Sequence, residues 1–276
     1  MIVGGIPFYL NHINPLYSLN ENINNLFFKS NGILFDEFNR LYSTLFSNDE
    51  LYIRIVELLS KHRYGLTIKG IASNLNVPKN GYLSNALEGL IDSGFIEKGV
   101  SYSNRKETIY QLIDFYTMFY FAFLKNKNND EQYWSNSIEL PKRRVYLGLC
   151  FETLAKLHIN QIKKALSIYG IGSTHYSYLK KGDNEEKGTQ IDLIIDRRDN
   201  VIDLCKLKYS LNQFEIDKDY YFNLTNKLDT FMNLYPKKSI RVILISTYGL
   251  KTNMYSNIAN QVVSRKYPIN CVNIPE

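Results

Sequence analysis

The chain has 276 residues, of which 45% are hydrophobic and 22% are charged, and its formal net charge is +6. This composition is sufficient to bury a core and excludes a chain that is disordered throughout. No apolar stretch reaches 18 residues, which argues against a transmembrane helix and a membrane partner. Cys150, Cys205 and Cys271 lack metal-ligand spacing, so they predict reduced thiols in a cytoplasmic protein. The mild positive charge permits contact with a polyanion without requiring it.

The first 46 residues predict a helical segment. Helical spacing begins near Leu19, and a second run over 36–46 places Phe38, Leu41, Tyr42 and Leu45 on one face. The Gly-Gly-Ile-Pro turn at 4–7 follows only three residues, a connection that expects chain before it. We therefore expect either a cap on the next domain or the tail of a domain that lies upstream.

Residues 47–125 predict a winged helix-turn-helix followed by one further helix. Three amphipathic runs occupy 50–62, 67–75 and 82–93, with Thr67 placed to cap the second and Gly94 to end the third. The β-rich stretches 95–100 and 108–113 then predict a hairpin. Three helices and a hairpin make the winged form of the helix-turn-helix.

Candidate nucleic-acid contacts lie on the third helix and on the hairpin. These residues are Lys79, Tyr82, Asn85, Lys98, Arg105 and Lys106. The third helix would enter a DNA groove, and the hairpin cations would reach phosphates. Only one residue on the outer face of that helix is basic, so contact with another protein is an equal alternative.

An aromatic run, DFYTMFYFAFLK, covers 114–125. A short helix that is apolar all round is buried between layers, so we expect a hinge that packs the winged helix against the next domain. The run is too short to span a membrane. Residues 126–139 begin with the polar sequence NKNNDE and predict a linker.

Residues 140–276 predict an α/β domain, which makes the whole chain a mixed α+β protein. A helix over 145–166 carries Glu152 within an apolar pattern, and a strand is expected at 169–178. Two strands, 190–196 and 201–209, follow a charged loop and are joined by a short turn. A helical stretch over 217–232 and a buried strand over 241–246 complete the pattern.

This layout is that of the PD-(D/E)XK nuclease fold. Glu152 on the helix and Asp192 on the first strand would hold a divalent metal, and Lys208 on the second strand would orient the attacking water. The second strand should carry an (Asp/Glu)-x-Lys motif, but Lys206 takes the place of the carboxylate. We therefore expect weak Mg²⁺ binding at most and little or no metal-dependent nuclease activity, and a Lys206–Asp192 ion pair is the alternative role for these two residues. Asp203 alternates to the other face unless a bulge intervenes.

Six segments occur in an order that resembles the C-terminal half of bacterial, Bacteroides-type AAA-superfamily ATPases. They are GGIPFYLN, FDEFNRLYSTLF, YGLTIKGIASNLNVP, LGLCFETLAKLHINQIKKAL, GTQIDLIIDRRDNVIDLCKLKYS and STYGLKTNMYS. The resemblance implies that 1–46 is similar to the end of an ATPase lid, and that a winged helix and a PD-(D/E)XK-like domain follow. The family's Cys-Glu-x-Lys motif is matched at Cys205 and Lys208, whereas Lys206 departs from it.

No G-x-x-x-x-G-K-[ST] motif occurs in the sequence, so any ATP would bind in a domain that this chain does not contain, and we expect no cofactor of its own. Two functions stay open at this point. In the first, the chain is the C-terminal part of a nucleic-acid-associated ATPase, with a DNA-binding-like winged helix and a degenerate, inactive restriction-endonuclease-like domain. In the second, it is a protein-interaction or regulatory scaffold without a nucleic-acid role.

Overall fold

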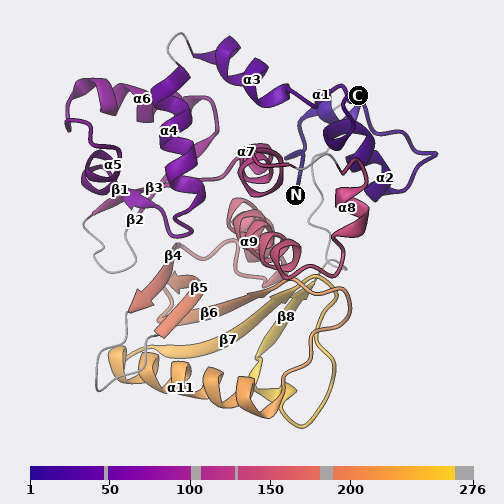
Figure 1. Ribbon diagram of the computed structural model, residues 1–276. Coiled ribbons are helices and arrows are strands. Elements are labelled where there is room, and N and C mark those ends of the chain that lie inside the picture. The colour runs from indigo at the N-terminus through magenta and orange to yellow at the C-terminus, as the bar shows by residue number, and fades with distance from the viewer. Residues whose placement is uncertain (47–48, 101–106, 128–129, 181–188, 265–276) are drawn as a thin grey trace. The chain divides into compact units, whose positions relative to one another are not determined.

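The computed structural model describes residues 1–46, 49–100, 107–127, 130–180 and 189–264. These residues form two compact units, Met1–Cys150 and Phe151–Glu276 (Figure 1). Each unit has its own sheet, so the chain is a mixed α/β protein, as the sequence predicts. Within the described ranges, no helix has both the length and the apolar character that crossing a bilayer requires.

The N-terminal segment is helical, as predicted. It contains α1 (Pro7–Leu10), α2 (Leu19–Ile23), a π-helical turn (Asn24–Phe28) and α3 (Glu37–Leu45). Ser18 begins α2 with a capping box, because its side chain accepts from the Glu21 N–H while the Glu21 carboxylate accepts from the Ser18 N–H.

Three helices and a hairpin follow, which confirms the prediction for this part of the chain. The elements are α4 (Asp49–Ser60), β1 (Leu66–Thr67), α5 (Ile68–Leu75), α6 (Gly81–Asp92), β2 (Ile96–Val100) and β3 (Thr108–Leu112). The strands form an antiparallel sheet in the order β1-β3-β2. Thr67 caps α5 as predicted, Asn80 caps α6, and Gly94 follows α6 with a φ of +74° that favours glycine.

The aromatic run folds as α7 (Phe115–Phe119) and a π-helical turn (Tyr120–Leu124). Its side chains pack against the N-terminal segment and against Trp134 of α8 (Tyr133–Asn136), with Phe119 in ring contact with both Phe27 and Trp134. The helix is therefore part of the core of the first unit. The contacts divide the chain at 150/151, within a helix, and not at the 126–139 segment that the sequence suggests as a linker.

The second unit begins inside α9 (Pro141–Leu157), which is followed by α10 (Ile159–Ala165). The sequence predicts one continuous helix here, whereas the structure breaks it at His158. Both the backbone N–H of His158 and its ring Nδ1 lie 3.1 Å from the carbonyl oxygen of Leu154.

A five-stranded mixed sheet is the centre of the second unit. Its strands are β4 (Ser173–Lys180), β5 (Thr189–Arg197), β6 (Val201–Lys208), β7 (Ser239–Ser246) and β8 (Gln261–Ser264), in the order β4-β5-β6-β7-β8. The first three strands are antiparallel, and β6, β7 and β8 run parallel. The predicted pairing of the two central strands is confirmed, while β8 is an addition that the sequence did not reveal.

One face of this sheet is covered by α11 (Lys218–Leu234) (Figure 1). Phe231 of α11 packs in a buried cluster with Ile202 and Leu204 of β6, and Leu224 packs with Val242 of β7. Every second side chain of a strand points to the same face, so residues 202, 204, 206 and 208 of β6 share one face. The two lysines of β6 therefore belong to the α11 side of the sheet.

Candidate functional site

A bulge in β5 sets the position of Asp192. The register between β4 and β5 shifts between Tyr176 and Tyr178, so that Asp192 and the next residue of β5 stand opposite Ser177. The Ser177 hydroxyl donates to the Asp192 carbonyl oxygen over 2.6 Å. A bulge inserts one extra residue into a strand and re-aims the side chains around it. The bulge considered from the sequence was one on β6, next to Asp203, but the structure has it on β5.

The Asp192 carboxylate is buried, with 5% of the residue exposed, and is satisfied by its neighbours in the sheet. Its Oδ2 accepts the backbone N–H of Leu207 over 3.1 Å, and its Oδ1 accepts from Gln190 Nε2 over 3.2 Å. Lys206 Nζ lies 2.8 Å from Oδ2, and Lys206 is itself only 7% exposed. The expected structural alternative, a Lys206–Asp192 ion pair, is therefore present.

Lys208 lies beside two aromatic rings on the same side of the sheet. Its Nζ is 4.7 Å from the ring centroid of Tyr220 and 5.6 Å from that of Phe214. Both distances are within the range of a cation–π interaction. The Tyr220 hydroxyl is buried and has no hydrogen-bond partner among the described residues, and burial followed by the charge of Asp192 raises its pKa.

Lys227 of α11 adds a third ammonium group. Burial, together with the positive charges of Lys206 and Lys208, lowers its pKa to about 8, and Asp192 opposes this shift. We call Asp192, Lys206, Lys208 and Lys227 the Asp192 cluster. Within the described residues, the cluster brings three ammonium groups near the Asp192 carboxylate, an arrangement that favours an anion over a divalent cation.

Lys227 was not among the residues predicted for the site, although the sequence carries a signal for it. Tyr220, Leu224, Lys227 and Phe231 follow one another at spacings of four, three and four residues, which places all of them on one face of α11. Leu224 and Phe231 are buried against the sheet. A lysine on the buried stripe of a helix is uncommon and marks a position whose charge needs an explanation.

Glu152, the proposed helix carboxylate of the nuclease site, lies half-buried on α9. Within the described ranges, no group of three or more His, Cys, Asp or Glu side chains is arranged to hold a metal ion. The contacts described for Asp192 involve an amide, a backbone N–H and an ammonium group. Glu152, Asp192 and Lys208 as catalytic groups, and Glu152 and Asp192 as metal ligands, stay predictions.

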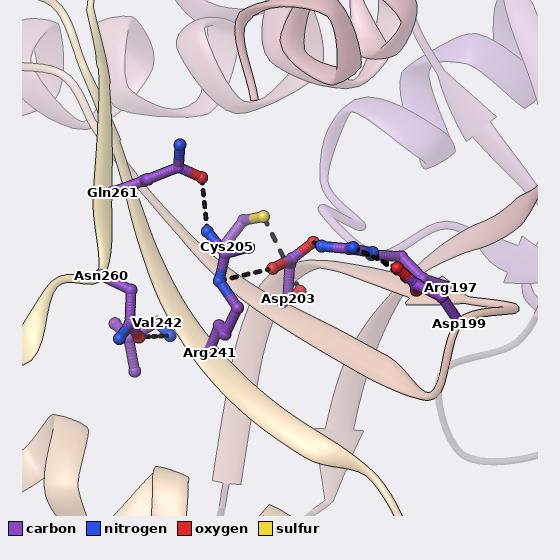
Figure 2. A network of polar contacts seen from close by, with 8 residues as sticks. All are labelled: Arg197, Asp199, Asp203, Cys205, Arg241, Val242, Asn260 and Gln261. Carbon is purple, nitrogen blue, oxygen red and sulfur yellow. Dashed lines mark hydrogen bonds and ion pairs between the residues drawn. The ribbon is translucent and has the colours of Figure 1, made fainter. Parts of the chain in front are cut away.

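The opposite face of β6 carries a second buried carboxylate that the sequence did not assign. Asp203 is fully buried, and its oxygens lie 3.4 Å from Arg197 Nη1 and 3.5 Å from Arg241 Nε. Figure 2 shows Asp203 between the two arginines, with Asp199 on the far side of Arg197 and Gln261 beyond Arg241. Burial raises the pKa of Asp203, against the effect of Arg241 and Arg197. The network ties β5, β6, β7 and β8 together.

Two of the predicted nucleic-acid residues, Tyr82 and Asn85, lie on the exposed face of α6, and Lys79 lies in the turn before it. Lys79, Tyr82 and Asn85 are exposed, Tyr82 to 55%. Lys98 of β2 is exposed too, but its ammonium group pairs with Glu88 of α6, which raises the pKa of Lys98. This pair leaves the face nearly neutral. Arg105 and Lys106 lie outside the described residues.

Comparisons with known proteins show little beyond this geometry. No protein-family model matches the chain, and no curated protein matches it. Among solved structures, a MepR mutant from S. aureus is similar over 45% of this chain and 93% of its own, with 18% identity and a TM-score of 0.26. The protein VC1899 from Vibrio cholerae is similar over 94% of this chain, with 14% identity and a TM-score of 0.29, and this chain spans about half (53%) of its length.

Proposed function

We propose that this chain is a DNA-associated protein in which residues 47–113 form a winged helix-turn-helix and the second unit is a nuclease-like domain that does not cut. The element order of three helices and a hairpin supports the first part. The ordered resemblance of six segments to AAA-superfamily proteins is the support for an ATPase partner. The absence of cleavage follows from the Asp192 cluster.

The observation that carries the silent-nuclease proposal is the 2.8 Å contact between Lys206 Nζ and Asp192 Oδ2. A metal-dependent nuclease needs that carboxylate oxygen for Mg²⁺. Here it holds an ammonium group and a backbone N–H instead. Lys208 and Lys227 add two positive charges nearby, which repel a cation and attract a phosphate.

In this proposal the second unit holds a DNA phosphate through its lysines without a metal. Lys206 fixes Asp192 in the sheet, and Lys208 and Lys227 supply the charge that faces the phosphate. Ammonium groups bind phosphates as point charges, so the contact carries little sequence information. Binding should therefore be weak and salt-dependent, and no bond is broken.

Cleavage assays on the full chain test this proposal. The unmodified chain should leave plasmid and short duplex DNA intact in Mg²⁺ or Mn²⁺. Lys206→Glu restores the (Asp/Glu)-x-Lys spacing with Lys208 and should raise Mn²⁺ affinity, while Lys237→Glu is a charge-matched control on an exposed residue. Robust Mg²⁺-dependent cleavage by the unmodified chain that disappears in Asp192→Ala would show that the site is intact and the proposal is wrong.

DNA binding is tested separately by fluorescence anisotropy across a salt series. The wild-type chain should bind weakly, with a small negative slope of log K against log salt, because few phosphates are contacted. Glu88→Gln releases Lys98 from its ion pair and should make the slope steeper by about one unit. Glu139→Gln, which releases Arg144 from a similar exposed pair, is the matched control. Binding that is insensitive to salt would contradict this picture.

The Lys98–Glu88 pair also favours a second candidate function, a protein-interaction module. A nearly neutral face with an exposed tyrosine is closer to a protein-contact surface than to a phosphate-binding one. If this candidate is correct, neither the wild-type chain nor Glu88→Gln will show measurable DNA binding, and Tyr82→Ala will weaken the complex with the protein partner.

A further inference from the structure

A polar pocket of about 270 Å³ lies at the end of the sheet where β5 turns into β6. Ser173 and Thr174 of β4 line it together with Arg198 and Asn200 of the turn. Lys206 lies six positions after Asn200 along β6, which corresponds to roughly 20 Å along an extended strand. The pocket is therefore separate from the Asp192 cluster.

The lining contains three cationic side chains, two of which are already paired. The pairs are Arg197 with Asp199 and Asp203, and Lys238 with Asp196. The guanidinium group of Arg198 has no acidic partner and no hydrogen bond within the part of the chain that the structure describes. Arg198 is thus the cation of the pocket whose charge is not compensated.

The exposed side chain of Arg198 lies against Gly172. The Arg198 N–H donates to the carbonyl oxygen of Gly172 over 2.9 Å. A Cβ atom at position 172 would lie 2.9 Å from Arg198 Cδ, which is closer than real Cβ contacts. The absence of a side chain at Gly172 therefore leaves space for the aliphatic part of Arg198, and a Cβ atom there would require Arg198 to shift.

Ser173 provides an independent observation. Its Oγ is buried and has no hydrogen-bond partner among the described residues. A buried hydroxyl without a partner is uncommon, and this one has its hydrogen-bonding capacity available to a ligand. Ser173 and its neighbour Thr174 both line the pocket.

We propose that this pocket binds a phosphate monoester, with Arg198 as its principal contact and the hydroxyls of Ser173 and Thr174 as additional donors. The planar fork of arginine matches the oxygens of a phosphate and donates two parallel hydrogen bonds. The volume leaves room for a small organic group beside the phosphate. A phosphorylated metabolite and the 5′ end of a nucleic acid both present this group.

Calorimetric titration of the full chain with ribose 5-phosphate tests the proposal, and inorganic phosphate serves as a second probe. Arg198→Gln should weaken binding about tenfold or more, since it removes a charge-assisted bidentate contact. Gly172→Ala is the sharper variant, because it displaces Arg198 without changing the charge of the protein. Lys237→Gln removes a neighbouring exposed cation outside the lining and should leave the affinity within about twofold.

A comparison of two ligands distinguishes a nucleic-acid end from a phosphorylated metabolite. A 5′-phosphorylated oligonucleotide that binds at least tenfold more tightly than its unphosphorylated counterpart, and loses this advantage in Arg198→Gln, would identify nucleic-acid ends. Ribose 5-phosphate binding without that advantage would identify a metabolite. No saturable binding of either ligand, or equal losses in Arg198→Gln and Lys237→Gln, would overturn the proposal.

Discussion

Removing the ammonium group of Lys206 should destabilise the second unit substantially, and Lys206→Met is the appropriate change because methionine keeps the length of the side chain. Breaking a buried ion pair from one side costs about 3–5 kcal/mol, since an uncompensated charge is left behind. Asp192 retains the Leu207 N–H and the Gln190 amide, and Lys227 lies close enough to interact with its charge. These contacts compensate part of the loss, so we expect about 2–4 kcal/mol. Because Lys206 and Asp192 are both less than 10% exposed, solvent screening reduces this figure little.

The appropriate assay is native-state hydrogen exchange in the second unit, because a chain with two compact units need not unfold in one step. The Leu207 amide is the most informative probe, since it donates to the Asp192 carboxylate. The double variant Asp192→Asn/Lys206→Met removes both charges and keeps an acceptor for Leu207, so it should recover most of the loss. A loss below about 0.5 kcal/mol in Lys206→Met, or a double variant that is no more stable than the single one, would refute the reasoning.

Three further predictions concern titration and packing. Burial is the main reason why the pKa of Lys227 is lowered to about 8, so the stability of the second unit should rise as the pH increases from about 8 toward 10.4. Nuclear magnetic resonance of ¹³C-methylated lysines should detect this titration, and Lys208→Gln should raise the pKa of Lys227. Because burial raises the pKa of Asp203, its contribution to stability is full below about pH 3.9 and falls as the pH rises through the pKa of Asp203 in the folded protein. The free energy of unfolding should therefore depend less on pH in Asp203→Asn across this range. Phe119→Ala should destabilise the first unit by about 3–5 kcal/mol, as followed by the fluorescence of Trp134, the single tryptophan; a loss below about 1 kcal/mol would contradict the packing seen here.

The periodicity of the sequence was sufficient to predict most elements. Apolar spacing located α4, α5 and α6, and Thr67 marked the start of α5, because these signals are local. The pairing of β5 with β6 followed from the short turn between them. The Lys206–Asp192 pair was predictable as an alternative, since both residues lie on neighbouring strands.

What could not be predicted depends on distant parts of the chain. The bulge at Asp192 arises from the pairing with β4, where Ser177 satisfies the displaced carbonyl group. Lys227 lies near Asp192 only because α11 packs on the sheet. Asp203 forms an ion pair with Arg241, which comes from β7. The role of the aromatic helix depends on the N-terminal segment and on Trp134, which surround it in the first unit. Periodicity shows that a helix is apolar all round, but it does not identify the elements that cover it.

The mixed direction of the five-stranded sheet has a consequence for the order in which the second unit assembles. The strands β4, β5 and β6 meet through antiparallel pairings, whereas β6 and β7 are parallel and have residues 209–238, including α11, between them. Pairing across a short turn closes a small loop quickly, while a parallel crossover closes a long one late. Asp192 and Lys206 both belong to the β5–β6 hairpin, so their ion pair can form before α11 docks. Lys227 then approaches an ion pair that already exists, so the positive charge of α11 is added to the sheet only when the helix docks.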